Sequence, residues 1–325
     1  MLKRLSALAI AAALLLPLAA ALAQQGGYPN RPVTIVVAFT PGGPSDVLSR
    51  IVGKRLNEIL HQPFIIENRP GAGGNIAAEQ VARATPDGYT LLMGNNSILA
   101  TNAALYKKLN YDPEKDFTPI SLIGSQANIL VVNPSVPANS MADLIALAKA
   151  SPGTINFASS GHGAAAHLAG ELFKTEAKVN IVHVAYKGAA PALQDVIGGH
   201  VQMMFATAAS VIGLIKDGKV RALAVTTPKR TALLLDIPTV DELGLTGFDA
   251  TTWHGLVAPS GTPKEVIDTL TFAVNSALKD PATQKALIEL GVDIIGNTPK
   301  EFDAYIKAEI PKWTAVVKNS GAKVE

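Results

Sequence analysis

Cysteine is absent from the 325 residues of this sequence. The chain can therefore form no disulfide bond, no thiolate metal site and no cysteine nucleophile, and it offers no cysteine for lipid attachment. An exported chain of this length without disulfides suits a bacterial periplasm. There, a large hydrophobic core supplies the stability that small secreted domains take from disulfides.

An excess of charge of one sign is also nearly absent. The formal net charge is +2, and Lys3 and Arg4 lie in the leader segment described next. Without these two residues, the basic and acidic residues balance at 26 each. A protein that binds nucleic acid or an anionic membrane presents a basic surface, so neither is expected as a partner of this chain.

Long hydrophobic runs are confined to the N-terminus. The basic pair precedes an apolar run over 5–20, and Ala21 and Ala23 occupy the two positions that a signal peptidase reads. The pattern predicts a cleaved signal peptide over residues 1–23 and a periplasmic location; an uncleaved anchor is the alternative. No later stretch is long and apolar enough to span a bilayer.

The remaining chain alternates strand and helix patterns, and 48% of all residues are hydrophobic, which is enough for two cores. A β-branched run over 33–39 predicts a buried parallel strand, and apolar residues at helical spacing predict a helix over 45–60. The sequence therefore predicts an α/β fold, with further strands at 64–67, 89–94, 128–132, 156–160, 180–185, 203–205, 222–226 and 253–259, and helices at 76–84, 141–149, 167–175, 191–197, 264–279, 281–290 and 299–319.

Two short strands, at 128–133 and 253–258, are the candidates for crossings between two lobes. Lobe 1 would then comprise 24–127 and 253–325, and lobe 2 would comprise 128–252. A discontinuous pair of this kind leaves a cleft at the hinge, where ligand pockets preferentially lie.

Glycine-rich turns lie between predicted strands and helices at four places. The backbone N–H groups and the positive dipole end of a helix N-terminus attract anions, and glycine lets the backbone approach a ligand closely. All four turns should lie at carboxyl ends of strands, where open α/β sheets bind ligands. These turns are at 40–46, 70–75, 159–163 and 186–189.

The sequence contains neither a phosphate-binding G-x-x-x-x-G-K-[ST] loop nor an H-E-x-x-H metal motif. His162 and His167 are five residues apart and do not share a helix face well, and His183 lies in a predicted strand as a core histidine. No metal site and no cofactor are therefore expected.

The glycine turns and their flanking residues together resemble the Bug (TctC-type) receptors of tripartite tricarboxylate transporters. The resemblance covers nearly the whole chain after the leader, in order. It rests on the segments at 28–46, 67–75, 86–92, 105–113, 158–161, 167–173, 183–188, 221–225 and 237–240.

This resemblance implies a two-lobed periplasmic binding protein of type II (a Venus flytrap) with two crossover strands. It also implies a small organic carboxylate as ligand, delivery to membrane permease subunits, a monomer and no catalysis. Carried over residue by residue, the family's binding loops correspond to Phe39, Thr40, Gly42, Gly43, Ser45, Asp46, Gly74, Asn75, Asn95, Asn96 and Ser97 in lobe 1, and to Ser159, Ser160, Gly161, His162, Gly163, His167, Tyr186, Lys187 and Gly188 in lobe 2.

Asp46 has a structural role by expectation, and two other positions, Ala206 and His162, bear on specificity. Asp46 is expected to brace its loop or cap its helix, because its charge would repel an anion. Ala206 stands where many relatives place an aspartate, which argues against an amino acid as ligand. His162 can donate to a carboxylate or stack on a ring, or it faces solvent.

Two other functions use the same residues. Ser159 could be the nucleophile of an esterase, but no G-x-S-x-G elbow and no recognisable triad spacing accompany it. A sensing co-receptor that reports ligand occupancy to a signalling protein would use the same cleft, and the sequence leaves that alternative open.

Overall fold

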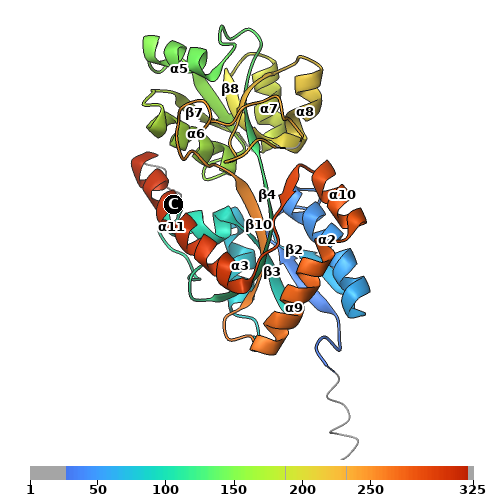
Figure 1. Ribbon diagram of the computed structural model, residues 1–325. Helices are drawn as coiled ribbons and strands as arrows, with labels where there is room; N and C mark the ends of the chain where they lie inside the picture. Colours follow the sequence, from blue (N-terminus) through green and yellow to red (C-terminus); the bar gives the residue numbers. More distant parts are fainter. Residues whose placement is uncertain (1–26, 187, 232, 321–325) are drawn as a thin grey trace, which may run out of the picture.

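Two separate β-sheets organise the chain, one in each of two lobes (Figure 1). The computed structural model describes residues 27–186, 188–231 and 233–320. The predicted signal peptide over 1–23 and the site residue Lys187 lie outside these described residues. Among the helices of the described part, none is both long enough and apolar enough to cross a membrane.

The first sheet has six strands and contains both parallel and antiparallel pairs. β1 pairs in parallel with β2 and β3, whereas β10 runs antiparallel to β3 and β4, and β11 runs antiparallel to β4. The strand order is β11 (Val292–Ile294), β4 (Phe117–Gln126), β10 (Thr252–Pro259), β3 (Thr90–Asn95), β1 (Val33–Val37) and β2 (Phe64–Asn68).

Helices cover both faces of this sheet because its strands are apolar on both sides. Val33, Ile35 and Val37 of β1 belong to one core and Val36 to the other, as the twofold periodicity of a strand requires. The first core includes α2 (Pro44–Leu60), α9 (Lys264–Ala277) and α10 (Pro281–Glu289); the second includes α3 (Asn75–Ala82), the π-helical turn η2 (Ser97–Thr101), α4 (Asn102–Leu105) and α11 (Pro299–Ser320).

The second sheet has five strands and forms the upper lobe of Figure 1. β6 pairs in parallel with β7 and β8, and β5 runs antiparallel to β8 and β9. The strand order is β7 (Val182–Ala185), β6 (Asn156–Ser159), β8 (Met203–Thr207), β5 (Asn128–Val132) and β9 (Arg221–Val225), and the helices are α5 (Met141–Ala150), α6 (Ala165–Glu176), α7 (Ala189–Ile197) and α8 (Ala208–Lys216).

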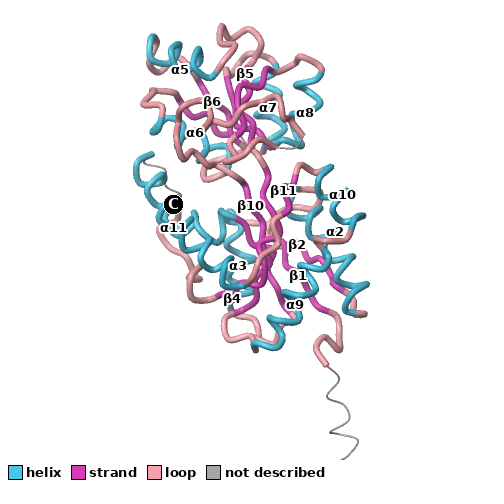
Figure 2. The backbone as a smooth tube through the Cα atoms, in the orientation of Figure 1, coloured by secondary structure: helices cyan, strands magenta, loops and turns pink. Residues whose placement is uncertain are grey.

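The chain crosses between the two sheets at the ends of β4 and β10. β4 leads through Ala127 directly into β5, and β10 brings the chain back after β9 and the segment that follows it (Figure 2). The two crossing strands pair with each other, with Thr252 opposite Gln126. β4 was not among the predicted strands. The lobe boundaries that the sequence suggests, at 127/128 and 252/253, stay a prediction.

Helix α11 ties the crossing strand β10 to both lobes. It packs against η2 and α4 of the lower lobe and also against α6 of the upper lobe. Glu309 of α11 is buried, and its Oε2 accepts hydrogen bonds from Trp253 Nε1 of β10 (2.9 Å) and Trp313 Nε1 (2.8 Å). The carboxylate of Glu309 therefore holds β10, the strand by which the chain returns to the lower lobe, against α11.

Candidate functional site

A cavity of about 260 Å³ lies where the glycine loops of the two lobes meet. The lower lobe contributes residues that follow β1, β2 and β3, and the upper lobe contributes the loop between β6 and α6. The cavity therefore lies at carboxyl ends of strands, as predicted for an α/β sheet. Its lining comprises Phe39, Gly73, Ser97, Asn102, Leu105 and Tyr106 from below and Ser160, Gly161, His162, Gly163 and Ala164 from above.

The loop after β1 is held in shape by Asp46. This buried carboxylate accepts hydrogen bonds from Gly42 N–H (2.9 Å), from Asn68 Nδ2 (2.9 Å) and from the guanidinium of Arg50. Burial alone would raise the pKa of Asp46, but the hydrogen bonds from these three residues lower it. Asp46 therefore braces its own loop and has its acceptor sites occupied by protein donors.

The turn after β3 presents Ser97 to the cavity. Asn95 Oδ1 accepts from the N–H of Ile98 (3.2 Å) and starts the π-helical turn. Asn96 is buried, and its Oδ1 has no hydrogen-bond partner among the described residues. Asn75 lies below the cavity, where its Oδ1 accepts from the cavity residue Asn102 (2.6 Å).

In the upper lobe, Ser159 fixes the glycine loop. Its buried hydroxyl lies 2.9 Å from Gly161 C=O and 2.6 Å from His183 Nε2, and it accepts from Gly161 N–H (3.2 Å). It donates its one proton to Gly161 C=O or to His183 Nε2, according to which nitrogen of His183 carries the ring proton. In either case, Ser159 links the glycine loop to β7.

The two lobes touch directly across the cavity. Gly163 has φ of 76°, a conformation that residues with side chains rarely adopt, and a Cβ at this position would collide with Leu105 Cδ2 of α4. Gly163 N–H also donates to the buried His167 Nδ1 (3.0 Å). A glycine is therefore required here by both the backbone angle and the approach of the opposite lobe.

Six of the predicted site residues line the cavity: Phe39, Ser97, Ser160, Gly161, His162 and Gly163. Ala206 does not, since it is buried in the core of the upper lobe on β8. Tyr186 donates its hydroxyl to Asp195 (2.6 Å), which lies on α7. The remaining described members of the predicted set lie outside the lining: Thr40, Gly42, Gly43, Ser45, Asp46, Gly74, Asn75, Asn95, Asn96, Ser159, His167 and Gly188.

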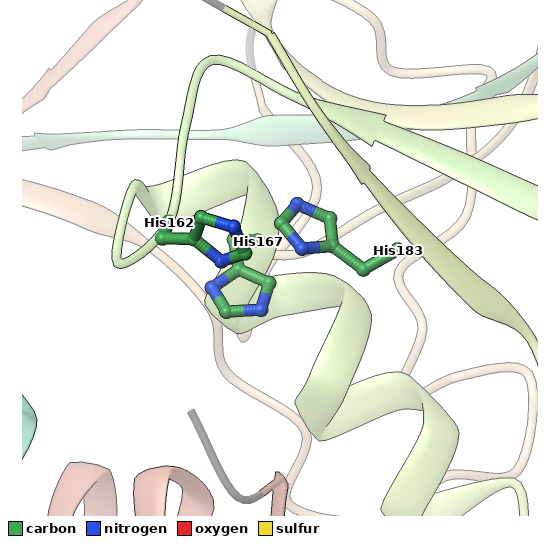
Figure 3. Close-up of side chains that lie close together, drawn as sticks. All are labelled: His162, His167 and His183. Carbon is green, nitrogen blue, oxygen red and sulfur yellow. The ribbon is translucent and has the colours of Figure 1, made fainter. Parts of the chain in front are cut away.

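The other five lining residues were not in the predicted set: Gly73, Asn102, Leu105, Tyr106 and Ala164. Three of them, Asn102, Leu105 and Tyr106, lie in α4 or directly after it. Sequence reasoning also set aside His162 and His167 as a pair and expected His183 in the core, whereas the fold brings these three histidines together (Figure 3). His183 reaches the other two because β7 pairs with β6, whose loop carries His162. Sequence spacing alone carries no signal of that pairing.

Two α/β lobes with crossing strands, and a small cavity of glycine loops between them, define a two-lobed solute-binding protein. The chain belongs to the TctC family, the tripartite tricarboxylate transporter family receptors, whose profile matches residues 48–322. This confirms the resemblance drawn from the sequence. The family consists of periplasmic transport receptors and not of enzymes, in agreement with the expectation of no catalysis.

Relatives match over almost the full chain. Protein BugT of Bordetella pertussis is 36% identical over 299 residues, which cover 92% of each chain. The structure titled "R. palustris Rpa4515 with adipate" is 40% identical, with a TM-score of 0.81 over 91% of this chain and 99% of that one. MatC (Rpa3494) from Rhodopseudomonas palustris with bound malate is 33% identical, with a TM-score of 0.77 over 89% of this chain and all of that one.

Proposed function

We propose that this protein captures a small organic carboxylate in the cavity between its lobes and delivers it, as a monomer, to the membrane subunits of a tripartite transporter. The observation that carries the proposal is the composition of the cavity. Among the described lining residues there is no acidic side chain, and the polar groups are hydroxyls, one amide, one imidazole and the backbone of a glycine loop. Such groups bind a carboxylate through hydrogen bonds to its oxygens.

The size of the cavity favours a small acid. Its volume of about 260 Å³ lies below the ~300–1,000 Å³ of pockets that hold drug-sized ligands. Adipate and malate, which two relatives hold, are small dicarboxylates. Di- and tricarboxylates and small aromatic acids are therefore the proposed ligand class.

Ligand binding would close the two lobes around the hinge at β4 and β10. Contacts from the upper loop at 160–164 reach the ligand only when this loop lies over the lower lobe, so the ligand shifts an existing equilibrium toward the closed form. The permease then recognises the closed surface.

A thermal-shift screen over a panel of carboxylic acids that includes adipate, malate, citrate and nicotinate tests this proposal. We expect one or more acids to raise the melting temperature, because a ligand that binds only the folded state stabilises it by mass action. A panel that leaves the melting temperature unchanged would contradict the proposal. A pull-down of a signalling protein that depends on the ligand would favour the co-receptor alternative.

Gly161→Val is expected to abolish the ligand-induced shift. Gly161 lines the cavity with φ of 140°, a backbone conformation that valine rarely adopts, so the substitution distorts the loop whose backbone faces the ligand. Gly244→Val is the matched control, because Gly244 also has a positive φ (104°) and an added Cβ there meets nothing within 4 Å. Equal ligand shifts in the two variants would exclude the glycine loop from the site.

Gly163→Ala is expected to weaken carboxylate binding about tenfold, because the added methyl group pushes Leu105 and the lower lobe away. Gly218→Ala is the control. It carries the same cost of placing alanine at a positive φ (67°), but its added Cβ meets no atom within 4 Å, so it should bind the carboxylate like the parent. The double variant Gly163→Ala with Leu105→Ala should recover much of the affinity. Isothermal titration calorimetry measures all four proteins, and a failure of the double variant to recover would contradict the steric explanation.

A further inference from the structure

Three imidazoles form a cluster at the upper wall of the cavity. One nitrogen from each of His162, His167 and His183 lies within 4.8 Å of the other two (Figure 3). The rings of His167 and His183 stack with their centroids 3.9 Å apart, and the His162 ring lies edge-on to both. His167 is buried, whereas His162 is exposed and lines the cavity, so the cluster leads from the protein interior to the ligand site.

The two inner rings lie where burial disfavours the charged form of an imidazole, since His167 is buried and His183 is half-buried. A neutral imidazole keeps a lone pair on one ring nitrogen, and this is the form that binds metal ions.

The hydrogen bonds bear on which nitrogen carries that lone pair. When Ser159 gives its hydroxyl proton to Gly161 C=O, His183 donates its Nε2–H to Ser159 and keeps its lone pair on Nδ1. His167 Nδ1 accepts from Gly163 N–H, so its proton is on Nε2, which lies 3.9 Å from Oε1 of the buried Glu171. A carboxylate behind the protonated nitrogen of a histidine is the arrangement that supports metal-ligating histidines.

We propose that His162, His167 and His183 bind a divalent transition-metal ion at the wall of the cavity, and that the open coordination positions of this ion accept a carboxylate oxygen of the ligand. The coordination of the ligand carboxylate by this ion rests on the proposed function. Three imidazoles with open positions suit zinc, cobalt, nickel or copper, whereas magnesium and calcium prefer oxygen ligands.

Binding requires the three nitrogens to approach one another and the stacked rings of His167 and His183 to tilt, so that both lone pairs point at one ion. Two nitrogens at ~2.0–2.1 Å from a tetrahedral zinc lie about 3.3 Å apart, and here the separation reaches up to 4.8 Å. His162 is placed to move, since it is exposed and stands between two glycines of positive φ, Gly161 and Gly163. The ion would replace Gly163 N–H at His167 Nδ1, and Glu171 would then hold the Nε2–H.

Zinc alone, titrated against a chromogenic chelator into protein purified without a polyhistidine tag, tests the site. We expect a single zinc ion per chain and a loss of affinity of at least ~100-fold in His162→Ala, because a removed ligand costs more than a removed supporting group. His162 is exposed, so this variant should fold. His183→Gln should lose affinity to a similar extent, and His200→Ala, at an exposed histidine outside the cluster, should bind like the parent.

Cobalt gives a second readout, because its visible spectrum reports nitrogen ligation and should change in His162→Ala but not in His200→Ala. Absence of zinc binding by the parent, or an affinity that His162→Ala leaves unchanged, would overturn the metal site.

Thermal shifts with adipate, malate and the other acids of the panel, measured with zinc and with EDTA, separate this inference from the proposed function. Tighter carboxylate binding with zinc in the parent, but not in His162→Ala, supports the coordination of the ligand. Equal shifts in zinc and EDTA would overturn that coordination and leave the carboxylate receptor intact. No shift in either condition would count against the receptor, while the zinc titration still decides the metal site.

Discussion

Glu309→Leu is expected to lower the free energy of unfolding by about 3–5 kcal/mol. The substitution leaves the indole N–H groups of Trp253 and Trp313 buried without an acceptor, and each such group costs roughly 1–3 kcal/mol. It also removes one of two carboxylate partners of Lys312, whose Nζ lies 2.7 Å from Glu309 Oε1 and 3.4 Å from Asp249 Oδ2. Urea denaturation followed by circular dichroism measures the loss.

Two variants separate the hydrogen bonds from the charge. Glu309→Gln retains a carbonyl oxygen that can accept from the indoles, so its cost should be about 1–2 kcal/mol. Asp303→Leu, on the same helix, removes a carboxylate that pairs with Lys307 at the surface, and such pairs contribute about 0.5 kcal/mol. If Glu309→Leu were no more costly than Asp303→Leu, the anchoring of β10 by α11 would have to depend on packing alone.

Much of the fold could be predicted, because most segments with the sequence pattern of a strand or a helix form that same element in the structure. The β-branched run after Pro32 became β1, and the helical spacing of apolar residues became α2, shifted by one residue at its start. Strand β4 was not predicted, because Pro119, Ser121 and Gly124 interrupt its apolar pattern. It is a strand because it pairs with β10 and β11, which lie far along the chain.

The candidate site also has parts that local sequence patterns predict and parts that depend on contacts between distant segments. The loop at 159–163 could be found because glycine next to a strand end is a local signal, and four of its residues line the cavity. The histidine cluster could not, since it depends on the pairing of β7 with β6. The same holds for Ser45, whose hydroxyl lies 2.9 Å from His254 Nε2, a residue 209 positions away.

Two of these buried histidines should make the fold sensitive to mild acid. Burial lowers the pKa of His254 to about 4 and, with repulsion from neighbouring cations, that of His167 to about 3, whereas a histidine in the unfolded chain titrates near 6.5. Below pH 6.5 the unfolded state therefore binds protons that the folded state does not. Stability is full above pH 6.5 and falls as the pH decreases toward 4, by about 2 kcal/mol for each histidine at pH 5.

The free energy of unfolding, measured in urea from pH 7 to pH 5 with EDTA present, tests this expectation. His254→Gln keeps a nitrogen for Ser45 but cannot titrate, so its stability should fall less steeply with decreasing pH, by about one proton in the slope. Burial raises the pKa of Glu171, which offsets part of the loss in parent and variant alike, so the difference between them isolates His254. His200→Gln controls for the loss of an exposed imidazole and should keep the parent's slope. A parent whose stability is level between pH 7 and pH 5 would mean that these imidazoles gain protons without leaving their buried positions.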